Sequence, residues 1–344
     1  MAGTDARRRT LAPIALRKLG SSDLEISPIL FGAWAIGGWM WGGADEAGSI
    51  DAIRAGIDHG VTTIDTAPIY GMGRSEELVG RAIAGLRDRV QIATKCGMRW
   101  DTDEGSEPWA TKDNEGRDLV VRRNSRPDSI ALECDRSLRR LGVEVIDLYQ
   151  VHQPDPSTPI EDTMGALLRL KEAGKIRAIG VSNYDVDQMK RAAAIGPLDS
   201  LQPPYSLIQR KIEPAILPYC REAHIGVIGY SPLERGLLAG AVPADRVFPP
   251  GDHRATHRFF TTENRARVLQ ALDAIRPIAD RNGATLAQLV IDWTIHEPGI
   301  TGAIVGARDA MQAVQNAGAL KLATTVEDRN EIRRAFDACS AAMM

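Results

Sequence analysis

The feature that most constrains the fold is a repeated alternation of short apolar runs with longer helical patterns. The apolar runs are continuous rather than interrupted at every second residue, as expected for parallel strands that are buried on both faces. Strands are predicted over residues 26–32, 61–65, 90–95, 145–152, 176–182, 200–204, 225–231 and 302–306. Helices are predicted over 47–60, 75–86, 127–142, 160–174, 186–196, 213–224, 285–298 and 310–320. This order predicts an α/β fold.

Two architectures share this alternation, the (β/α)8 TIM barrel and the doubly wound open sheet. An open sheet that binds a dinucleotide commonly carries G-x-G-x-x-G after its first strand. Here the first predicted strand runs into GAWAIGGWMWGG (32–43), which lacks that spacing. The barrel is therefore predicted, as a single domain over residues 14–340.

Three further segments complete the predicted organisation. Residues 14–27, with a turn at Gly20, predict an N-terminal β-hairpin that plugs the barrel floor. Residues 1–13 contain arginines without an apolar core after them, so we expect a disordered tail and not a secretory signal. The long inserts 98–126 and 240–261 each follow a strand, which places them on the catalytic rim of a barrel.

Composition narrows the class of protein. A net charge of −3 gives no indication of a nucleic-acid partner, and no stretch approaches the ~18 apolar residues of a membrane span. The four cysteines are far apart, so we expect free thiols in a reducing cytoplasm. His253 and His257 have i, i+4 spacing, but no carboxylate completes a site and no metal is predicted. We expect a monomer or a weak homo-oligomer.

Four ionisable residues fall at the carboxyl ends of three successive predicted strands, where barrel enzymes place their chemistry. Asp65 closes the second strand and Tyr70 lies in the loop after it, while Lys95 and His152 close the third and fourth strands. Each of them alone would be read as a turn, a solvent contact or a packed side chain. Together, on neighbouring strands, they predict one convergent site.

The combination suits the reduction of a carbonyl group by a nicotinamide cofactor. The alkoxide that forms must gain a proton, and a phenol of ordinary pKa about 10 gives one reluctantly. A lysine ammonium within ~4–6 Å favours the phenolate and lowers that pKa by roughly 1–3 units. An aspartate keeps the lysine charged, and a histidine can hydrogen-bond the carbonyl oxygen. These roles are predicted for Tyr70, Lys95, Asp65 and His152.

At this point the residues carry a family resemblance. The chain is similar to the aldo-keto reductases over about residues 15 to 335, in the motifs IDTAPIYGMGRSEELVGRAI, VQIATKCG, DLYQVHQPD, GKIRAIGVSNY, LQPPYSLI, YSPLERGLL and IVGARDAMQAVQN, which follow that family's order. GAWAIGGWMWGG and QPPY most resemble its bacterial, general-stress-protein-like branch. The resemblance implies a (β/α)8 fold, NADPH-dependent carbonyl reduction, and a catalytic tetrad of Asp65, Tyr70, Lys95 and His152.

The resemblance also implies a cofactor site across the barrel mouth. Ser182, Asn183 and Gln202 would hold the carboxamide, Tyr230 would stack on the nicotinamide ring, and the loop after it would hold the pyrophosphate. The implied cofactor residues are Gly32, Trp34, Asp65, Ser182, Asn183, Gln202, Tyr230, Ser231, Pro232, Leu233, Gly236, Leu238, Arg254, Gly306, Arg308, Gln312, Gln315 and Asn316.

The last motif departs from the commonest family version, which has a lysine-serine pair after a proline near Val305–Ala307. The lysine that often holds the 2′-phosphate is missing. Arg308, expected one turn into the helix N-terminus, can replace it as a bidentate cation. Gln312 and Asn316 would follow on the same helical face. NADP(H) is therefore predicted over NAD(H).

Aromatic residues dominate the rest of the rim, because five of the six tryptophans fall near it: Trp34, Trp39, Trp41, Trp100 and Trp109. The predicted substrate contacts are Trp34, Tyr70, His152 and Trp100, and the substrate is a small carbonyl compound or alcohol. Three alternatives stay open. One is a cofactor-binding sensor or regulatory module with little turnover. Another is a metal-dependent hydrolase, although no H-x-H ends a strand. The third is operation in the oxidative direction, as a sugar or alcohol dehydrogenase.

Overall fold

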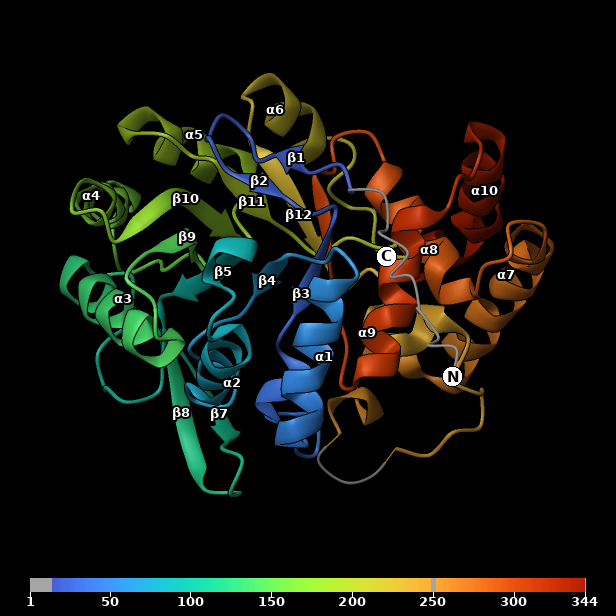
Figure 1. Ribbon diagram of the computed structural model, residues 1–344, viewed down its shortest axis with the longest axis horizontal. Coiled ribbons are helices and arrows are strands. Elements are labelled where there is room, and N and C mark those ends of the chain that lie inside the picture. Colours follow the sequence, from blue (N-terminus) through green and yellow to red (C-terminus); the bar gives the residue numbers. More distant parts are fainter. Residues whose placement is uncertain (1–13, 249–251, 344) are drawn as a thin grey trace, which may run out of the picture.

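Eight parallel strands close into a barrel at the centre of the molecule in a computed structural model that describes residues 14–248 and 252–343 (Figure 1). Around the barrel the strands are β3 (Ile29–Gly32), β4 (Thr63–Asp65), β5 (Gln91–Cys96), β9 (Ile146–Val151), β10 (Ile176–Ser182), β11 (Ser200–Gln202), β12 (Gly226–Tyr230) and β13 (Gly302–Gly306). All neighbouring pairs are parallel. The predicted (β/α)8 TIM barrel is confirmed. The tail predicted over 1–13 lies outside the described residues.

Helices surround the barrel and cover its outer face (Figure 1). Those that match the predicted helices are α1 (Glu46–Asp58), α2 (Arg74–Ile83), α3 (Pro127–Leu141), α4 (Ile160–Glu172), α5 (Val186–Ile195), α6 (Ile216–Glu222), α8 (Leu286–His296) and α9 (Ala310–Ala317). Two long helices, α7 (Thr262–Arg281) and α10 (Val326–Met343), were not predicted. They pack against each other beside the barrel and bury residues such as Leu272 and Phe336.

The predicted hairpin closes the barrel floor. Its strands β1 (Arg17–Lys18) and β2 (Glu25–Ile26) pair antiparallel. Leu19 and Leu24 at its turn are buried in one cluster with barrel residues such as Leu148 and Ile228. Gly20 has a left-handed φ of 56°, and a Cβ there would lie 2.2 Å from the carbonyl oxygen of Asp199. Only glycine fits this turn without a shift of the backbone.

Both inserts lie on the rim, as predicted. The first forms a small antiparallel sheet of β6 (Met98–Arg99), β7 (Ser106–Lys112) and β8 (Asp118–Arg123). It docks on the loop after β3, because Trp39 Nε1 donates to the carbonyl oxygen of Lys112 at 3.0 Å. The described part of the second insert contains two short 3₁₀ helices, His253–Ala255 and Arg258–Phe260.

Asp147 ties the opposite end of the barrel together. This buried carboxylate accepts the backbone N–H of Ile92 at 2.8 Å and pairs with Arg87 at 2.8 Å and Arg177 at 3.0 Å. It therefore links the start of β9 to β5 and β10 through charge-assisted hydrogen bonds, which are the stronger kind.

Replacing Asp147 should destabilise the fold. We expect Asp147→Asn to lower the free energy of unfolding by about 1–3 kcal/mol, because the substitution removes the charge from a buried, fully used acceptor. Urea denaturation would measure the change. Asp23→Asn is the matched control, since that carboxylate pairs with the same Arg177 at 3.5 Å but is 80% exposed, and it should cost less than ~0.5 kcal/mol. Equal losses in the two variants would contradict the assignment.

Candidate active site

Three adjacent strands bring the predicted ionisable residues together. Asp65 ends β4, Lys95 lies near the end of β5, and His152 directly follows β9. The barrel order β4–β5–β9 makes these strands neighbours, with Lys95 paired in register with Gln150. Since carboxyl ends of parallel strands meet at one edge, the side chains can converge.

A tight turn returns Tyr70 to the same place. Gly71 and Gly73 both have left-handed φ values, 67° and 98°, and the Gly73 N–H donates to the carbonyl oxygen of Pro68 at 2.7 Å. A Cβ on Gly71 would lie 2.2 Å from the carbonyl oxygen of Gly37. The glycines therefore permit a bend that a side chain would block, and the bend carries the phenol over the barrel mouth.

Lys95 uses all three of its N–H donors. Its Nζ donates to Asp65 Oδ1 at 2.6 Å, to the carbonyl oxygen of Thr66 at 2.9 Å and to the Tyr70 hydroxyl oxygen at 3.2 Å. The side chain is fully buried, with 0% exposed. A buried ammonium with every donor satisfied is held in one position.

The charges in this group are set by burial and by one another. Burial acts to lower the pKa of Lys95, but Asp65 and Tyr70 outweigh it and the pKa is raised, so the ammonium persists. Burial raises the pKa of Tyr70; the Lys95 charge opposes that rise and Asp65 adds to it. The predicted effect of the lysine is present, since its charge lowers the phenol pKa. The predicted net lowering is wrong, because the cost of burying a phenolate away from water outweighs the attraction of the lysine.

Two glutamines complete the surroundings of Asp65. Gln202 Nε2 donates to Asp65 Oδ2 at 2.8 Å and to Gln150 Oε1 at 3.3 Å, and Gln150 Nε2 lies 3.5 Å from Asp65 Oδ2. Gln150 was missed from the sequence, although a polar residue inside the apolar run of β9 is its signal. Since the Gln202 nitrogen is used, that residue has only its Oε1 to offer a carboxamide.

His152 faces Tyr70 edge-on. The ring centroids are 5.7 Å apart, at an interplanar angle of 86°. Burial, and then the charge of Lys95, holds the pKa of His152 well below its ordinary value. The imidazole is therefore neutral at pH 7 and carries one N–H that can donate to a carbonyl oxygen.

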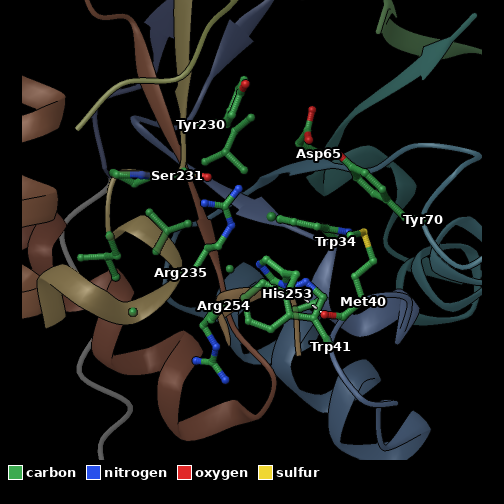
Figure 2. A pocket seen from close by; sticks show the side chains of 18 of the residues that line it. Trp34, Met40, Trp41, Asp65, Tyr70, Tyr230, Ser231, Arg235, His253 and Arg254 are labelled. Atoms are coloured by element: carbon green, nitrogen blue, oxygen red, sulfur yellow. Dashed lines mark hydrogen bonds between the residues drawn. The ribbon is translucent and has the colours of Figure 1, made fainter. Parts of the chain in front are cut away.

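A cavity of about 900 Å³ opens over these residues and runs to the start of α9. Figure 2 shows Asp65, Tyr70 and Trp34 at one side, and Tyr230, Ser231 and Arg235 at the other. The predicted residues that line it are Gly32, Trp34, Asp65, Tyr70, His152, Ser182, Asn183, Gln202, Tyr230, Ser231, Pro232, Leu233, Gly236, Arg254, Gly306, Arg308, Gln312, Gln315 and Asn316.

Three predicted residues do not line the cavity. Lys95 contacts it through Tyr70, and Leu238 is fully buried in the main core. Trp100, predicted as a substrate contact, is half-buried and packs against a cluster that contains Ile69 and Val121.

Polar groups at the ends of β10 and β12 are ordered by one another. Asn183, with a left-handed φ of 62°, donates to Ser182 Oγ at 3.0 Å and to the carbonyl oxygen of His152 at 3.1 Å. Tyr230 donates its hydroxyl to Asn183 Oδ1 at 3.0 Å. Asn tolerates this backbone conformation better than most residues, and the network orders this side of the cavity, where the carboxamide is predicted to bind.

The loop after β12 contributes a residue that the sequence interpretation missed. Glu234, Arg235 and Gly236 are successive left-handed residues, with φ of 44°, 56° and 90°. Arg235 points into the cavity (Figure 2), with its guanidinium 5.9 Å above the Trp34 ring. Its Nη1 meets His257 Nε2 at 2.9 Å, while its buried Nε has no partner among the described residues. The signal in the sequence was a charged residue next to a glycine in YSPLERGLL.

The second insert reaches across the cavity to the loop after β3. His253 Nδ1 lies 2.8 Å from the carbonyl oxygen of Met40, and its ring centroid lies 5.2 Å from that of Trp34 and 5.0 Å from that of Trp41 (Figure 2). Arg254 is already paired with Asp252 at 2.7 Å, whereas Arg235 lies 3.9 Å from the carboxylate of Glu234, so the charge of Arg254 is less available than that of Arg235. In residues 14–248 and 252–343, no group of three or more His, Cys, Asp or Glu side chains is placed to hold a metal ion.

At the far end of the cavity, Arg308 lies outside α9. The helix begins at Ala310 with Asp309 as its N-cap, so the expectation that Arg308 sits one turn inside the helix is wrong. The Asp309 carboxylate accepts the N–H of Gln312 at 2.8 Å. Any recognition of a phosphate here therefore depends on the exposed Arg308 guanidinium more than on free helical N–H groups. In this structure Arg308 Nη2 donates to the carbonyl oxygen of Gly43 at 2.8 Å.

The structure also describes the cysteines and the lengths of the helices. Cys96, Cys134, Cys220 and Cys339 are free thiols and all are buried. Among the described helices, none has the length and apolar character that crossing a bilayer requires.

Comparison with known proteins places the chain in a family. The model of the Aldo/keto reductase family matches residues 28–337. The aldo-keto reductase YhdN of Bacillus subtilis is 41% identical over 293 residues, 84% of each chain. An NADH-specific methylglyoxal reductase of Escherichia coli is 37% identical over 326 residues, 93% of this chain and 98% of that protein.

A solved structure agrees with these relatives. The glycerol dehydrogenase AKR11B4 of Gluconobacter oxydans superposes with a TM-score of 0.83 at 36% identity, covering 96% of both chains. The family match and the structural similarity both cover nearly the whole described chain. The chain belongs to the aldo/keto reductase family and is an oxidoreductase that reduces carbonyl groups with a nicotinamide cofactor.

Proposed function

We propose that the protein is an NADPH-dependent reductase of small aldehydes and ketones, sugar carbonyls included, of the bacterial branch that GAWAIGGWMWGG and QPPY indicate. The observation that supports this most directly is the contact of the buried Lys95 ammonium with both Asp65 and the Tyr70 hydroxyl. The same arrangement serves alcohol oxidation in the reverse direction.

The cavity residues fit a dinucleotide. A cavity of about 900 Å³ is of the size that ligands of this kind occupy. Arg235 presents a buried guanidinium whose Nε lacks a partner among the described residues, and a diphosphate would satisfy it. Ser182, Asn183 and Gln202 Oε1 would hold the carboxamide, with Tyr230 against the ring. When bound, the cofactor supplies the hydride.

The remaining chemistry belongs to the protein. Lys95 donates to the phenol oxygen of Tyr70, so the phenol hydrogen is left to donate to a carbonyl oxygen. Because burial raises the Tyr70 pKa, the phenol keeps its proton until a substrate oxygen becomes basic enough to take it. His152, neutral, donates a second hydrogen bond to that oxygen and orients it. As the proton leaves Tyr70, Lys95 lies 3.2 Å from the developing phenolate.

The relatives indicate a substrate size. Methylglyoxal and glycerol, named for the Escherichia coli and Gluconobacter oxydans proteins, are three-carbon molecules with oxygen on adjacent carbons. We propose small oxygenated carbonyl compounds as the first class to screen, by measuring NADPH consumption with a panel of aldehydes, ketones and sugars. Absence of turnover across the panel would contradict the proposed function.

Removing the Tyr70 hydroxyl tests the proton donor. Tyr70→Phe should lower turnover by about 10²-fold or more, because general acid catalysis contributes at least that factor. Cofactor binding, followed by NADPH fluorescence, should persist. Tyr219→Phe, on α6, is the matched control and should leave turnover unchanged. A near wild-type rate for Tyr70→Phe would remove the residue from the mechanism.

Removing the Lys95 charge tests its coupling to Tyr70. Reduction requires the protonated phenol, so the rate falls as pH rises through the Tyr70 pKa. The Lys95 charge lowers that pKa, and its loss raises it. In Lys95→Met the alkaline limb of the kcat profile should therefore move to higher pH, at a much lower maximum. Lys190→Met, an exposed lysine on α5, should keep the wild-type profile. An unmoved limb in Lys95→Met would count against the coupling.

Two arginines should act on different parts of the cofactor. Arg308→Ala should raise the Kd of NADPH about tenfold, equivalent to ~1.4 kcal/mol, and leave that of NADH unchanged, because only NADPH carries the 2′-phosphate. Arg235→Met should raise both Kd values by a similar factor, because the diphosphate is common to both. Arg276→Ala, on exposed α7 surface, is the control. An unchanged NADPH/NADH preference in Arg308→Ala would exclude its predicted role.

A further inference from the structure

One peptide unit joins the backbones of the two catalytic strand ends. It links Cys96 to Gly97, directly after Lys95. Its carbonyl oxygen accepts the backbone N–H of His152 at 2.9 Å. Its N–H is donated to both carboxylate oxygens of Glu133, each at 3.1 Å. The position of Lys95 relative to His152 therefore depends on this peptide, which is bonded to His152 at its carbonyl oxygen and to Glu133 at its N–H.

The backbone leaves the sheet at this peptide. Gly97 has a left-handed φ of 86°, and a Cβ there would lie 2.9 Å from Ser125 Oγ. The Gly97 N–H points to Glu133 on α3. A buried N–H needs an acceptor, and Glu133 is the acceptor that the fold provides.

Glu133 is an unusual choice for that acceptor. Its side chain is 3% exposed, and no salt bridge joins it to a cation within the described residues. Arg99 donates to Ser129 Oγ at 2.7 Å, and Ser129 in turn donates to Glu133 Oε1 at 3.3 Å, so the hydrogen-bonded link between the guanidinium and the carboxylate runs through the serine. Burying a carboxylate without a direct cation is costly. A neutral amide would also accept the N–H, but with one oxygen instead of two and without the negative charge.

We propose that Glu133 is a positioning residue, whose carboxylate fixes the Cys96–Gly97 peptide and thereby the placement of Lys95 relative to His152. The inference rests on the proposed function, since those two residues matter to turnover only if the protein reduces carbonyl groups as described.

The charge of Glu133 changes in an accessible pH range. Burial raises its pKa to about 7, against the opposing charge of Arg99. Protonation below that pH removes the negative charge and weakens the acceptor for the Gly97 N–H. At high pH the charged carboxylate accepts the Gly97 N–H at full strength, and at low pH the neutral side chain resembles a glutamine.

The neighbouring groups do not change charge in the same range. The segment after β5 contributes Arg99, whose pKa is raised, and Asp101, whose pKa is lowered, in both cases by their hydrogen bond and charge against the opposing effect of burial. Burial raises the pKa of Cys96, from β5, and of Tyr149, from β9, well above their ordinary values. Between about pH 5.5 and pH 8.5, Glu133 is the group of this cluster that titrates.

The test compares kcat of wild type and Glu133→Gln across that range. The ratio of the two should be about tenfold at about pH 8.5, within the ~10²-fold that a 1 Å displacement can cost, and should fall towards one at about pH 5.5. The Kd of NADPH should be unchanged, because Glu133 does not line the cavity. A ratio that is constant with pH, or equal to one at high pH, would overturn the proposal.

The matched control is Asp147→Asn. That residue is also a buried carboxylate that accepts a backbone N–H of β5, but at the opposite end of the barrel. It should destabilise the protein without a pH-dependent change in the kcat ratio. The same pH dependence in Asp147→Asn would show that general loss of stability causes the effect, and would overturn the proposal.

Hydrogen exchange of the Gly97 and His152 amides separates this inference from the proposed function. In Glu133→Gln at high pH, both amides should exchange faster by more than the other barrel amides do. In Asp147→Asn they should change no more than the other barrel amides, because that variant lowers the stability of the whole fold. Unchanged exchange would overturn the proposal even if the wild type turned over no carbonyl, a result that would by itself contradict only the proposed function. If Glu133→Gln fails to fold, Glu133→Asp replaces it. That variant should show a lowered kcat at high pH, and a wild-type kcat throughout would overturn the proposal.

Discussion

The buried pair of Lys95 and Asp65 is the interaction on which the rest of the site depends. Taking both charges out of water costs several kcal/mol for each ion, and their attraction offsets this only with good geometry and further hydrogen bonds. Here the ammonium also donates to Thr66, and the second carboxylate oxygen accepts from Gln202. Lys95 lies on β5, Asp65 and Thr66 lie at the end of β4 and directly after it, and Gln202 ends β11. The pair is therefore satisfied only when the barrel closes in the right register.

This dependence explains how stability and chemistry are divided along the barrel. At the floor, the hairpin and Asp147 close the structure with apolar burial and charged hydrogen bonds that lie away from the active-site cavity. At the rim, left-handed residues such as Asn183 and Arg235 hold strained conformations that only a rigid scaffold maintains. A displacement of the site by a fraction of an ångström would reduce catalysis before it unfolded the protein. The stable barrel floor is what allows the rim residues to keep their strained conformations.

Local patterns were enough to predict the barrel and the four strand-end residues, because a strand end is visible in a single run of sequence such as VTTID. Residues that act across elements were not visible in this way. Gln150 and Glu133 matter through contacts with β4 and β5 that no spacing reveals, and Arg235 enters the cavity only because its loop is left-handed. Arg308 lies outside α9 because Asp309, the residue after it, caps the helix. α7 and α10 were missed because they stabilise each other by tertiary packing.

The direction of the Tyr70 pKa shows why a list of residues does not give a mechanism. A lysine beside a tyrosine suggests an acidic phenol, yet in the structure burial outweighs the lysine and the phenol remains protonated. The lysine then has a different task, which is to stabilise the phenolate at the moment it forms and to leave the ground state unchanged. An interaction that strengthens as charge develops lowers the barrel enzyme's activation free energy, whereas one that is equally strong beforehand does not. Tyr70 gives its proton to the alkoxide in reduction, and its phenolate takes one from the alcohol in oxidation. Lys95 stays charged beside the oxygen in both directions, so the site itself sets no preference between reduction and oxidation.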